Sequence, residues 1–314
     1  MLEIRNLNVI LENINKRIYI LRNISLTIDG GEILGLVGES GSGKTVLGKT
    51  VLGLTAFPIK KLSGDIIFEK TVIDEDNVHK FRGKKISMIF QNPTSCLNPV
   101  FTIKNQIIET IRNSNPDINA SQAKRIAIEL LKKVEIDHPD QRLDSYPHNL
   151  SGGMNQRVMI ALALATNPEI LIADEPTTAL DVTVQSSIID LLKNLNKNYN
   201  LSILFITHDL NLIINIADRV AVIYAGEILE IVSKEDLKIK RFKHPYTELL
   251  NRCIPTLEEK KDILTTIPGE ITNNTEIYEN RCIFYDRCPR KLEICKNKKP
   301  VFENNYKCFN PLNL

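Results

Sequence analysis

The sequence predicts an α/β fold with a mainly parallel sheet that is covered by helices. Three observations predict this fold. Short apolar runs of strand type alternate with helical segments, a glycine-rich phosphate-binding pattern joins a strand to a helix, and a later apolar run ends in two carboxylates. The chain has 314 residues and is 43% hydrophobic, which suits one large domain with additions or two domains. A net charge of +2 gives no strong attraction toward nucleic acid or acidic lipid.

The first half of the chain predicts strands, a loop, a helix and then a helical insertion. A turn at Asp29, Gly30 and Gly31 separates the second and third strands. Apolar residues at helical spacing predict the insertion at residues 100–149. The elements expected before it are strands at 2–11, 18–28 and 33–37, a helix at 46–54, and strands at 65–68 and 86–90.

The second half predicts helices and strands in alternation. Ser151 precedes the first of these helices in the position of an N-cap. Beyond Ser233 the chain is richer in Lys, Glu, Asn and Pro and lacks sustained periodicity, so we expect an appended module. The elements expected before it are a helix at 152–165, a strand at 170–173, a helix at 184–195, a strand at 203–206, a helix at 210–217 and a strand at 219–224.

The phosphate-binding pattern is the most specific feature of the chain. It matches G-x-x-x-x-G-K-[ST] at each fixed position. Glycines let the backbone approach a phosphate closely, and the following helix offers unpaired N–H groups. Lys44 supplies charge for β- and γ-phosphates, and Thr45 a hydroxyl for Mg²⁺. The loop consists of Gly38, Glu39, Ser40, Gly41, Ser42, Gly43, Lys44 and Thr45.

Asp174 and Glu175 follow the strand expected at 170–173. Asp174 suits a Mg²⁺ ligand that acts through water, and Glu175 suits the group that polarises the water attacking the γ-phosphate. Taken alone, two acids at the end of a strand fit a solvated turn equally well.

A third pattern carries a family resemblance. Leu150, Ser151, Gly152 and Gly153, followed by Met154, resemble the Leu-Ser-Gly-Gly-Gln signature of the ATP-binding-cassette (ABC) ATPases, with Met154 departing at the last place. Other family elements follow in the expected order. Gln91 matches the Q-loop glutamine, which binds Mg²⁺ and water, Ala179, Leu180 and Asp181 match the D-loop, and His208 matches the switch histidine that contacts the γ-phosphate.

The resemblance covers residues 1–230 and implies a P-loop NTPase cassette with a RecA-like core sheet, an antiparallel β subdomain and a helical subdomain at about 95–160. It also implies that two cassettes pack head to tail, with ATP and Mg²⁺ between Lys44 of one and Ser151 of the other. Tyr19 is the candidate for stacking on adenine, and an ordinary strand tyrosine is the alternative.

The tail resembles the C-terminal module of oligopeptide and dipeptide importer ATPases. His244, Pro245, Tyr246 and Thr247 precede a helix-like segment at 248–253, and Pro268, Gly269 and Glu270 follow. We therefore expect an ABC nucleotide-binding domain at 1–232 and an oligopeptide-transporter module at 233–314.

This resemblance implies an ATPase that energises import of di- and oligopeptides. The implied partners are a second, distinct ABC ATPase and two transmembrane permeases, with an extracytoplasmic peptide-binding protein acting indirectly and no nucleic acid. No apolar run of the chain approaches the ~18–20 residues that span a bilayer, so we expect a peripheral subunit on the cytoplasmic face of the membrane. A nickel or metal-chelate importer ATPase and a soluble ABC protein acting on ribosomes or DNA are the alternatives.

Four of the six cysteines lie in the tail, with gaps of five, six and twelve residues. Because no secretion signal is recognised, a metal or cluster site is expected before a disulfide scaffold. The family resemblance implies a 4Fe–4S cluster, for which four thiolates are suitable ligands. Zinc and four free thiols remain alternatives, although zinc sites usually pair their cysteines as C-x₂₋₄-C. The four are Cys282, Cys288, Cys295 and Cys308, whereas Cys96 and Cys253 are interpreted as buried or incidental.

Overall fold

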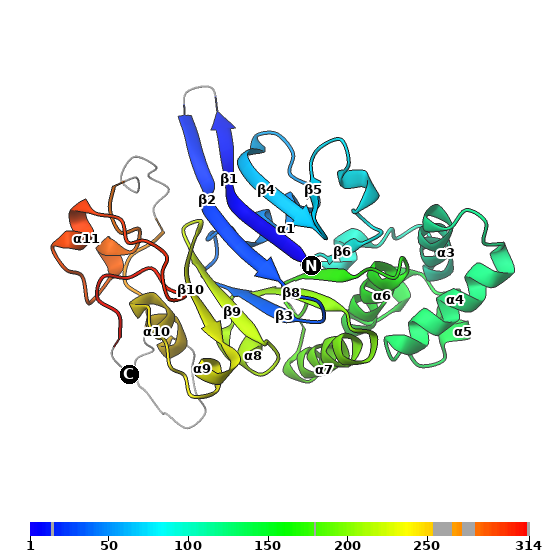
Figure 1. The fold of residues 1–314 in the computed structure, drawn as a ribbon. Helices are drawn as coiled ribbons and strands as arrows, with labels where there is room; N and C mark the ends of the chain where they lie inside the picture. The colour runs from blue at the N-terminus through cyan, green and yellow to red at the C-terminus, as the bar shows by residue number, and fades with distance from the viewer. Residues whose placement is uncertain (14–15, 179, 254–265, 272–279, 313–314) are drawn as a thin grey trace. The chain divides into compact units, whose positions relative to one another are not determined.

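The computed structural model describes most of the chain (Figure 1). The described residues are 1–13, 16–178, 180–253, 266–271 and 280–312. They form two compact units. The first comprises Met1–Asp29, Ile33–Asp74 and Phe205–Leu314, and the second Gly30–Glu32 and Glu75–Leu204. Among the described residues, no helix is both long enough and apolar enough to cross a membrane.

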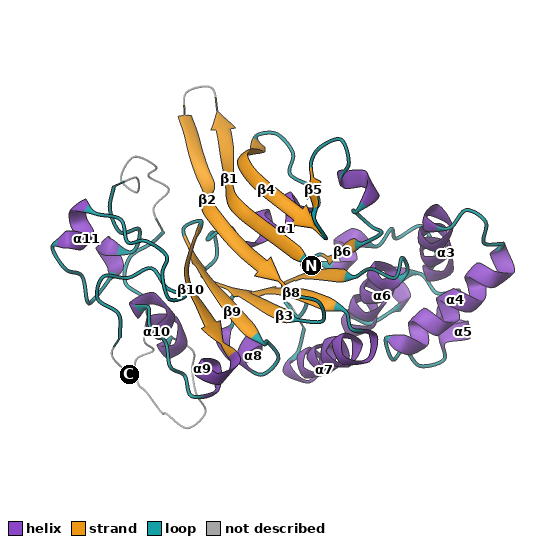
Figure 2. Cartoon of the chain, in the orientation of Figure 1, coloured by secondary structure: helices purple, strands orange, loops and turns teal. Residues whose placement is uncertain are grey.

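An antiparallel sheet of four strands lies in the first unit, in the order β2-β1-β4-β5 (Figure 2). The predicted strands at 2–11 and 18–28 are confirmed. The strand predicted at 65–68 begins earlier, and β5 was not predicted because it is only three residues long. The bounds are β1 (Leu2–Asn13), β2 (Lys16–Ile28), β4 (Ile59–Phe68) and β5 (Thr71–Ile73).

A second sheet has six strands in the order β10-β9-β3-β8-β7-β6. Strand β3 pairs in parallel with β9, and β9 pairs antiparallel with β10. All five residues of β3 are buried, so this strand fixes the start of the phosphate loop that follows it. Strand β10 was not predicted. Four strands of this sheet are β3 (Ile33–Val37), β8 (Ser202–Thr207), β9 (Arg219–Tyr224) and β10 (Glu227–Ser233).

The helices of the first unit differ from the predictions at their ends. The helix expected at 46–54 begins earlier and ends before Gly53, whose φ of +60° lies in the left-handed region. The helix expected at 210–217 ends at Ile214. The helices are α1 (Lys44–Val51), α8 (Leu210–Ile214), α9 (Lys234–Lys238), α10 (Pro245–Arg252), η4 (Tyr285–Arg287) and α11 (Ile294–Asn297).

The second unit is largely helical, as the apolar spacing predicts. The side chains of Thr102 and Asn119 cap α3 and α4, and Asn119 forms a capping box with Gln122. Strands β6 (Ile86–Ile89) and β7 (Ile170–Asp174) pair in parallel. The helices are η1 (Val78–Lys80), α2 (Pro93–Cys96), α3 (Ile103–Ser114), α4 (Ala120–Lys133), α5 (Pro139–Arg142), η2 (Pro147–Asn149), α6 (Gly152–Leu164) and α7 (Val182–Tyr199).

Candidate nucleotide-binding site

The phosphate loop joins β3 to α1 in the first unit. Lys44 is the first residue of α1 and is buried. Its Nζ donates hydrogen bonds to the carbonyl oxygens of Gly38 at 2.8 Å and of Glu39 at 2.9 Å. The Lys44 ammonium is therefore held by two carbonyls at the start of the loop, in the position that a phosphate-binding loop requires.

Two glycines are needed for the shape of the loop. A Cβ on Gly38 would lie 2.1 Å from the backbone oxygen of Ile223 in β9. Gly43 has a φ of +102°, and a Cβ there would lie 2.8 Å from Cδ2 of Leu21 in β2. The hydroxyl of Ser42 is buried and has no hydrogen-bond partner among the described residues. A tightly curved backbone with an unsatisfied buried hydroxyl suits a bound phosphate.

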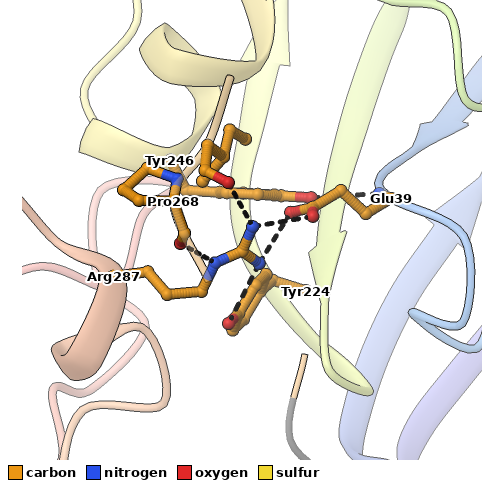
Figure 3. Close-up of polar contacts among 6 residues, drawn as sticks. Glu39, Tyr224, Tyr246, Pro268 and Arg287 are labelled. Carbon is orange, nitrogen blue, oxygen red and sulfur yellow. Dashed lines mark hydrogen bonds and ion pairs between the residues drawn. The ribbon is translucent and has the colours of Figure 1, made fainter. Parts of the chain in front are cut away.

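Glu39 contacts two residues from the C-terminal part of the chain, Tyr246 and Arg287. Its backbone N–H donates to Oη of Tyr246 at 3.0 Å. Its carboxylate accepts two hydrogen bonds from Arg287, at 3.0 Å and 2.9 Å (Figure 3). The sequence motif indicated Glu39 only as a variable loop position. Nothing in the sequence signalled Arg287, because it is 248 positions further along the chain.

Strand β2 and the turn between β9 and β10 pack behind the loop. Gly226, in that turn, donates its backbone N–H to the Ser42 carbonyl at 3.0 Å, and its own carbonyl accepts from the backbone of Arg22 at 2.8 Å. A Cβ on Gly226 would lie 2.2 Å from the Ile20 carbonyl. Tyr19 precedes Ile20 on β2, and the Arg22 guanidinium lies 5.4 Å from its ring centroid. Tyr19 thus belongs to the strand that packs against the loop, and its stacking on adenine stays a prediction.

The other candidates of the first unit lie in the helix after the loop and after β8. Thr45 is the second residue of α1. His208 follows β8 directly and is exposed. The residue after it, Asp209, caps α8 by accepting from the backbone of Asn211 at 2.9 Å. The backbone beside His208 is thereby fixed.

The carboxylates of the second unit lie at the end of β7. Asp174 is buried, and Glu175 follows with a φ of +46°, a left-handed conformation that is uncommon for a residue other than glycine. Strained backbone of this kind is concentrated at functional sites. Oε2 of Glu175 accepts hydrogen bonds from Nε2 of Gln91 at 2.9 Å and from Oγ1 of Thr178 at 2.8 Å. The structure therefore brings together Gln91 and Glu175, which are far apart in sequence, and adds Thr178.

The signature residues lie at the N-terminus of α6, in the second unit. Oγ of Ser151 accepts from the backbone of Met154 at 3.3 Å, which confirms the predicted N-cap. A Cβ on Gly153 would lie 2.7 Å from Cγ1 of Val184 in α7, whereas one on Gly152 would be at ordinary contact distance, 3.7 Å from its nearest neighbour. The packing of α6 on α7 thus explains Gly153 but not Gly152, which has room for a side chain.

The D-loop position leads into α7. Asp181 is the N-cap of that helix, and its Oδ1 accepts from the backbone of Val184 at 2.9 Å. Its carboxylate therefore has a structural role in addition to the role expected from the family resemblance. Ala179, the first residue of the expected D-loop, lies outside the described residues.

The four tail cysteines lie in the first unit, and the structure gives no support to a bound metal there. In the part of the chain that the structure describes, no group of three or more His, Cys, Asp or Glu side chains is placed to hold a metal ion. Cys282 and Cys295 are buried. Burial raises the pKa of Cys282 to about 12 and that of Cys308 to about 11, and it also raises the pKa of Cys288. Burial therefore favours the protonated form of these three thiols.

The two remaining cysteines were interpreted as buried or incidental. Cys96 is exposed at the end of α2 and Cys253 is half-buried after α10. Neither is fully buried, so neither is a core residue.

Comparison with known proteins places this chain in a family. The ABC transporter family matches residues 21–178, and the C-terminal region of oligopeptide/dipeptide transporters matches residues 229–295. The oligopeptide transport ATP-binding protein OppD of Bacillus subtilis is 43% identical over 87% of this chain and 78% of its own length. The dipeptide transport ATP-binding protein DppD of Haemophilus influenzae is 40% identical over 92% of this chain and 89% of its own.

A solved structure supports the same assignment. The ATP-binding cassette MJ0796, in a dimeric post-hydrolysis state with ADP and Pi, is 30% identical, with a TM-score of 0.67 over 74% of this chain and 99% of that one. The chain therefore belongs to the ABC ATPases, in the branch of ATP-binding subunits of oligopeptide and dipeptide transporters.

Proposed function

We propose that this chain binds and hydrolyses ATP to drive the import of di- and oligopeptides through an ABC transporter. The observation that carries the proposal is that a single chain matches both the ABC family and the oligopeptide/dipeptide C-terminal region. The relatives named for oligopeptide and dipeptide transport support peptides, not nickel chelates, as the cargo. They also support a transport role over an action on ribosomes or DNA.

We assign binding of the β- and γ-phosphates to Lys44 and to the backbone N–H groups of residues 38–45. The curved loop and the buried hydroxyl of Ser42 within it support this assignment. Tyr19 would stack on adenine and His208 would contact the γ-phosphate.

We assign Mg²⁺ to Thr45, Asp174 and Gln91, where the ion neutralises charge on the phosphates when bound. Glu175 would act as the general base. Hydrogen bonds from Gln91 and Thr178 to its Oε2 hold the carboxylate in one orientation, which suits a group that positions and polarises an attacking water.

Ser151, Gly152, Gly153 and Asp181 are proposed to act on the ATP of a second cassette packed head to tail. The dimeric state in which MJ0796 was solved with ADP and Pi supports this pairing. The partner is proposed to be a distinct ABC ATPase. Residues 1–232 would form the cassette, and residues 233–314 the oligopeptide-transporter module. The chain would lie on the cytoplasmic face of the membrane and bind two permeases, which would receive peptide from an extracytoplasmic binding protein.

The 4Fe–4S cluster stays a proposal that rests on the family resemblance. Metal binding would require the buried thiols to lose their protons, so loading should release protons and raise affinity with pH. Anaerobically purified chain with iron, sulfide and visible absorbance would support the cluster. Colourless chain carrying zinc, or no metal, would contradict it.

Uptake of labelled cargo by cells that lack the chain tests the transport function. Cells complemented with the native sequence should accumulate di- and oligopeptides, and Lys44→Ala should abolish the uptake. Lys49→Ala, in the same helix α1, is the matched control and should transport normally. Uptake of nickel chelates without peptides would contradict the cargo, and peptide uptake by Lys44→Ala would contradict the mechanism.

A further inference from the structure

Arg287, the residue before Cys288 in the tail, is joined to the phosphate loop by a two-pronged ion pair (Figure 3). Its Nη1 and Nη2 donate to the two carboxylate oxygens of Glu39 at 3.0 Å and 2.9 Å. This is the bidentate geometry in which an arginine holds a carboxylate most firmly. The Arg287 side chain is only 5% exposed, so solvent screens this pair far less than it screens a surface pair.

The remaining donors of Arg287 fix the guanidinium to other parts of the same unit. Its Nε donates to the Pro268 carbonyl at 2.8 Å, and its Nη2 also donates to the Ile267 carbonyl at 3.2 Å. Nη1 lies 3.4 Å from Oη of Tyr224 in β9. Because the guanidinium is held from several sides, it defines one position for the Glu39 carboxylate.

Glu39 in turn is held at every polar group. Besides the carboxylate, its N–H donates to Tyr246 and its carbonyl accepts from Lys44 Nζ at 2.9 Å and from the Ser42 backbone at 3.2 Å. A short chain of contacts therefore runs from Arg287 through Glu39 to the lysine assigned to the phosphates. A shift of Glu39 would move a carbonyl to which the Lys44 ammonium is bonded.

Charge gives a second reason for the pair. A carboxylate in a loop that binds a highly anionic triphosphate would repel the ligand if its charge were uncompensated. Arg287 supplies the compensating charge from outside the loop. The arginine thus acts on the loop in two ways, through geometry and through electrostatics.

The cysteine-bearing segment of the tail, residues 280–312, sets the position of Arg287. Arg287 is the last residue of η4, and its backbone N–H donates to the Phe284 carbonyl. The next residue is Cys288. The ring of Phe284 packs edge-on against Tyr224 and Tyr246, with centroids 5.2 Å apart in each case. The segment therefore reaches the loop twice, directly through Arg287 and indirectly through Tyr246.

We propose that Arg287 is a positioning residue of the phosphate loop, through which the folded cysteine segment of the tail sets the affinity of the chain for ATP. This inference rests on the proposed function. It makes the tail a part of the nucleotide site in the same chain.

The test is calorimetric binding of ATP with Mg²⁺ to the purified full chain and three variants. Arg287→Met keeps an aliphatic stem but removes the charge, and should raise the Kd for ATP at least about fivefold, the lower end of ordinary coupling between sites. Arg287→Lys restores the positive charge but not the two-pronged guanidinium, so its Kd for ATP should lie between those of the native chain and Arg287→Met. Arg281→Met is the matched control, because Arg281 is an ion-paired arginine of the same segment whose partner is Asp286. It should stay within about twofold of the native Kd.

A double-mutant cycle with Glu39→Gln separates positioning from stability. If Arg287 acts through Glu39, Arg287→Met should weaken ATP binding much less in the Glu39→Gln background than in the native one. A purely structural role would lower the melting temperature and leave the Kd unchanged, and equal effects in both backgrounds would overturn the inference. If Arg287→Met does not fold, Arg287→Lys carries the same cycle. Failure of the native chain to bind ATP would instead refute the proposed function.

Discussion

Acidification should destabilise the C-terminal part of the chain through His244. This residue is buried, and its Nδ1 accepts a hydrogen bond from the Tyr246 backbone at 3.0 Å as the N-cap of α10. Burial lowers the pKa of His244 to about 3, against the opposing effect of a hydrogen bond to the Lys307 backbone. Protonation would place a charge in the core and turn the accepting nitrogen into a donor, which breaks the cap.

The size of the effect follows from proton linkage. Between pH 6.5 and about 3, His244 binds a proton in the unfolded chain but not in the native one. The contribution of neutral His244 to the free energy of unfolding is therefore full above pH 6.5 and is lost as the pH falls. From pH 7.5 to about pH 5 the loss spans about 1.5 pH units, or about 2 kcal/mol of unfolding free energy. The sign is unambiguous: the native state resists protonation, so acid favours unfolding.

The assay is urea unfolding of the native chain and of His244→Asn at both pH values. Asparagine retains a side-chain cap and does not titrate, so its stability should fall less on acidification by about 2 kcal/mol. The buried carboxyl of Glu230, whose pKa is raised by burial, accepts from the His244 backbone N–H at 3.0 Å, and asparagine at this position retains that N–H. Equal losses in the two proteins would refute the assignment of a neutral, buried His244.

Further predictions concern the second unit. Gly153→Ala should destabilise the chain by roughly 1–3 kcal/mol, because the new Cβ would lie 2.7 Å from Val184 Cγ1. Gly152→Ala should fold with near-native packing. Thermal melts of the two variants test this. A lower melting temperature for Gly152→Ala than for Gly153→Ala would contradict it. Glu175→Gln should retain ATP binding and lose turnover in the complete complex, since it removes the base but keeps an acceptor for Gln91. Native turnover by that variant would remove Glu175 from the role.

Local sequence patterns predicted much of the candidate site. The loop at 38–45 and the cap at Ser151 are set by residues within a few positions of each other, so spacing is sufficient to identify them. The same holds for most strands of the sheets, whose apolar runs are buried. The exact ends of the helices were less predictable, because left-handed residues decide them, as Gly53 does after α1.

Contacts between distant segments could not be predicted. Strand β10 was not predicted, and it includes Glu227 and Glu230, which are buried although both carry carboxylates. Glu227 is neutralised by Lys299 and Lys307, about 70 to 80 positions away, and no local pattern contains these partners. The pairing of Arg287 with Glu39 was invisible for the same reason, and only the folded chain shows that the tail holds the loop.

Equilibrium binding of ATP with Mg²⁺ to the purified full chain, compared with Lys44→Ala and the matched control Lys49→Ala, tests the central claim most directly. Loss of the charge-assisted contacts of Lys44 should cost about 2–3 kcal/mol, a Kd roughly 30- to 150-fold higher, while Lys49→Ala should bind like the native chain. Equal affinity in Lys44→Ala and the native chain would contradict the assignment of residues 38–45 as the nucleotide site.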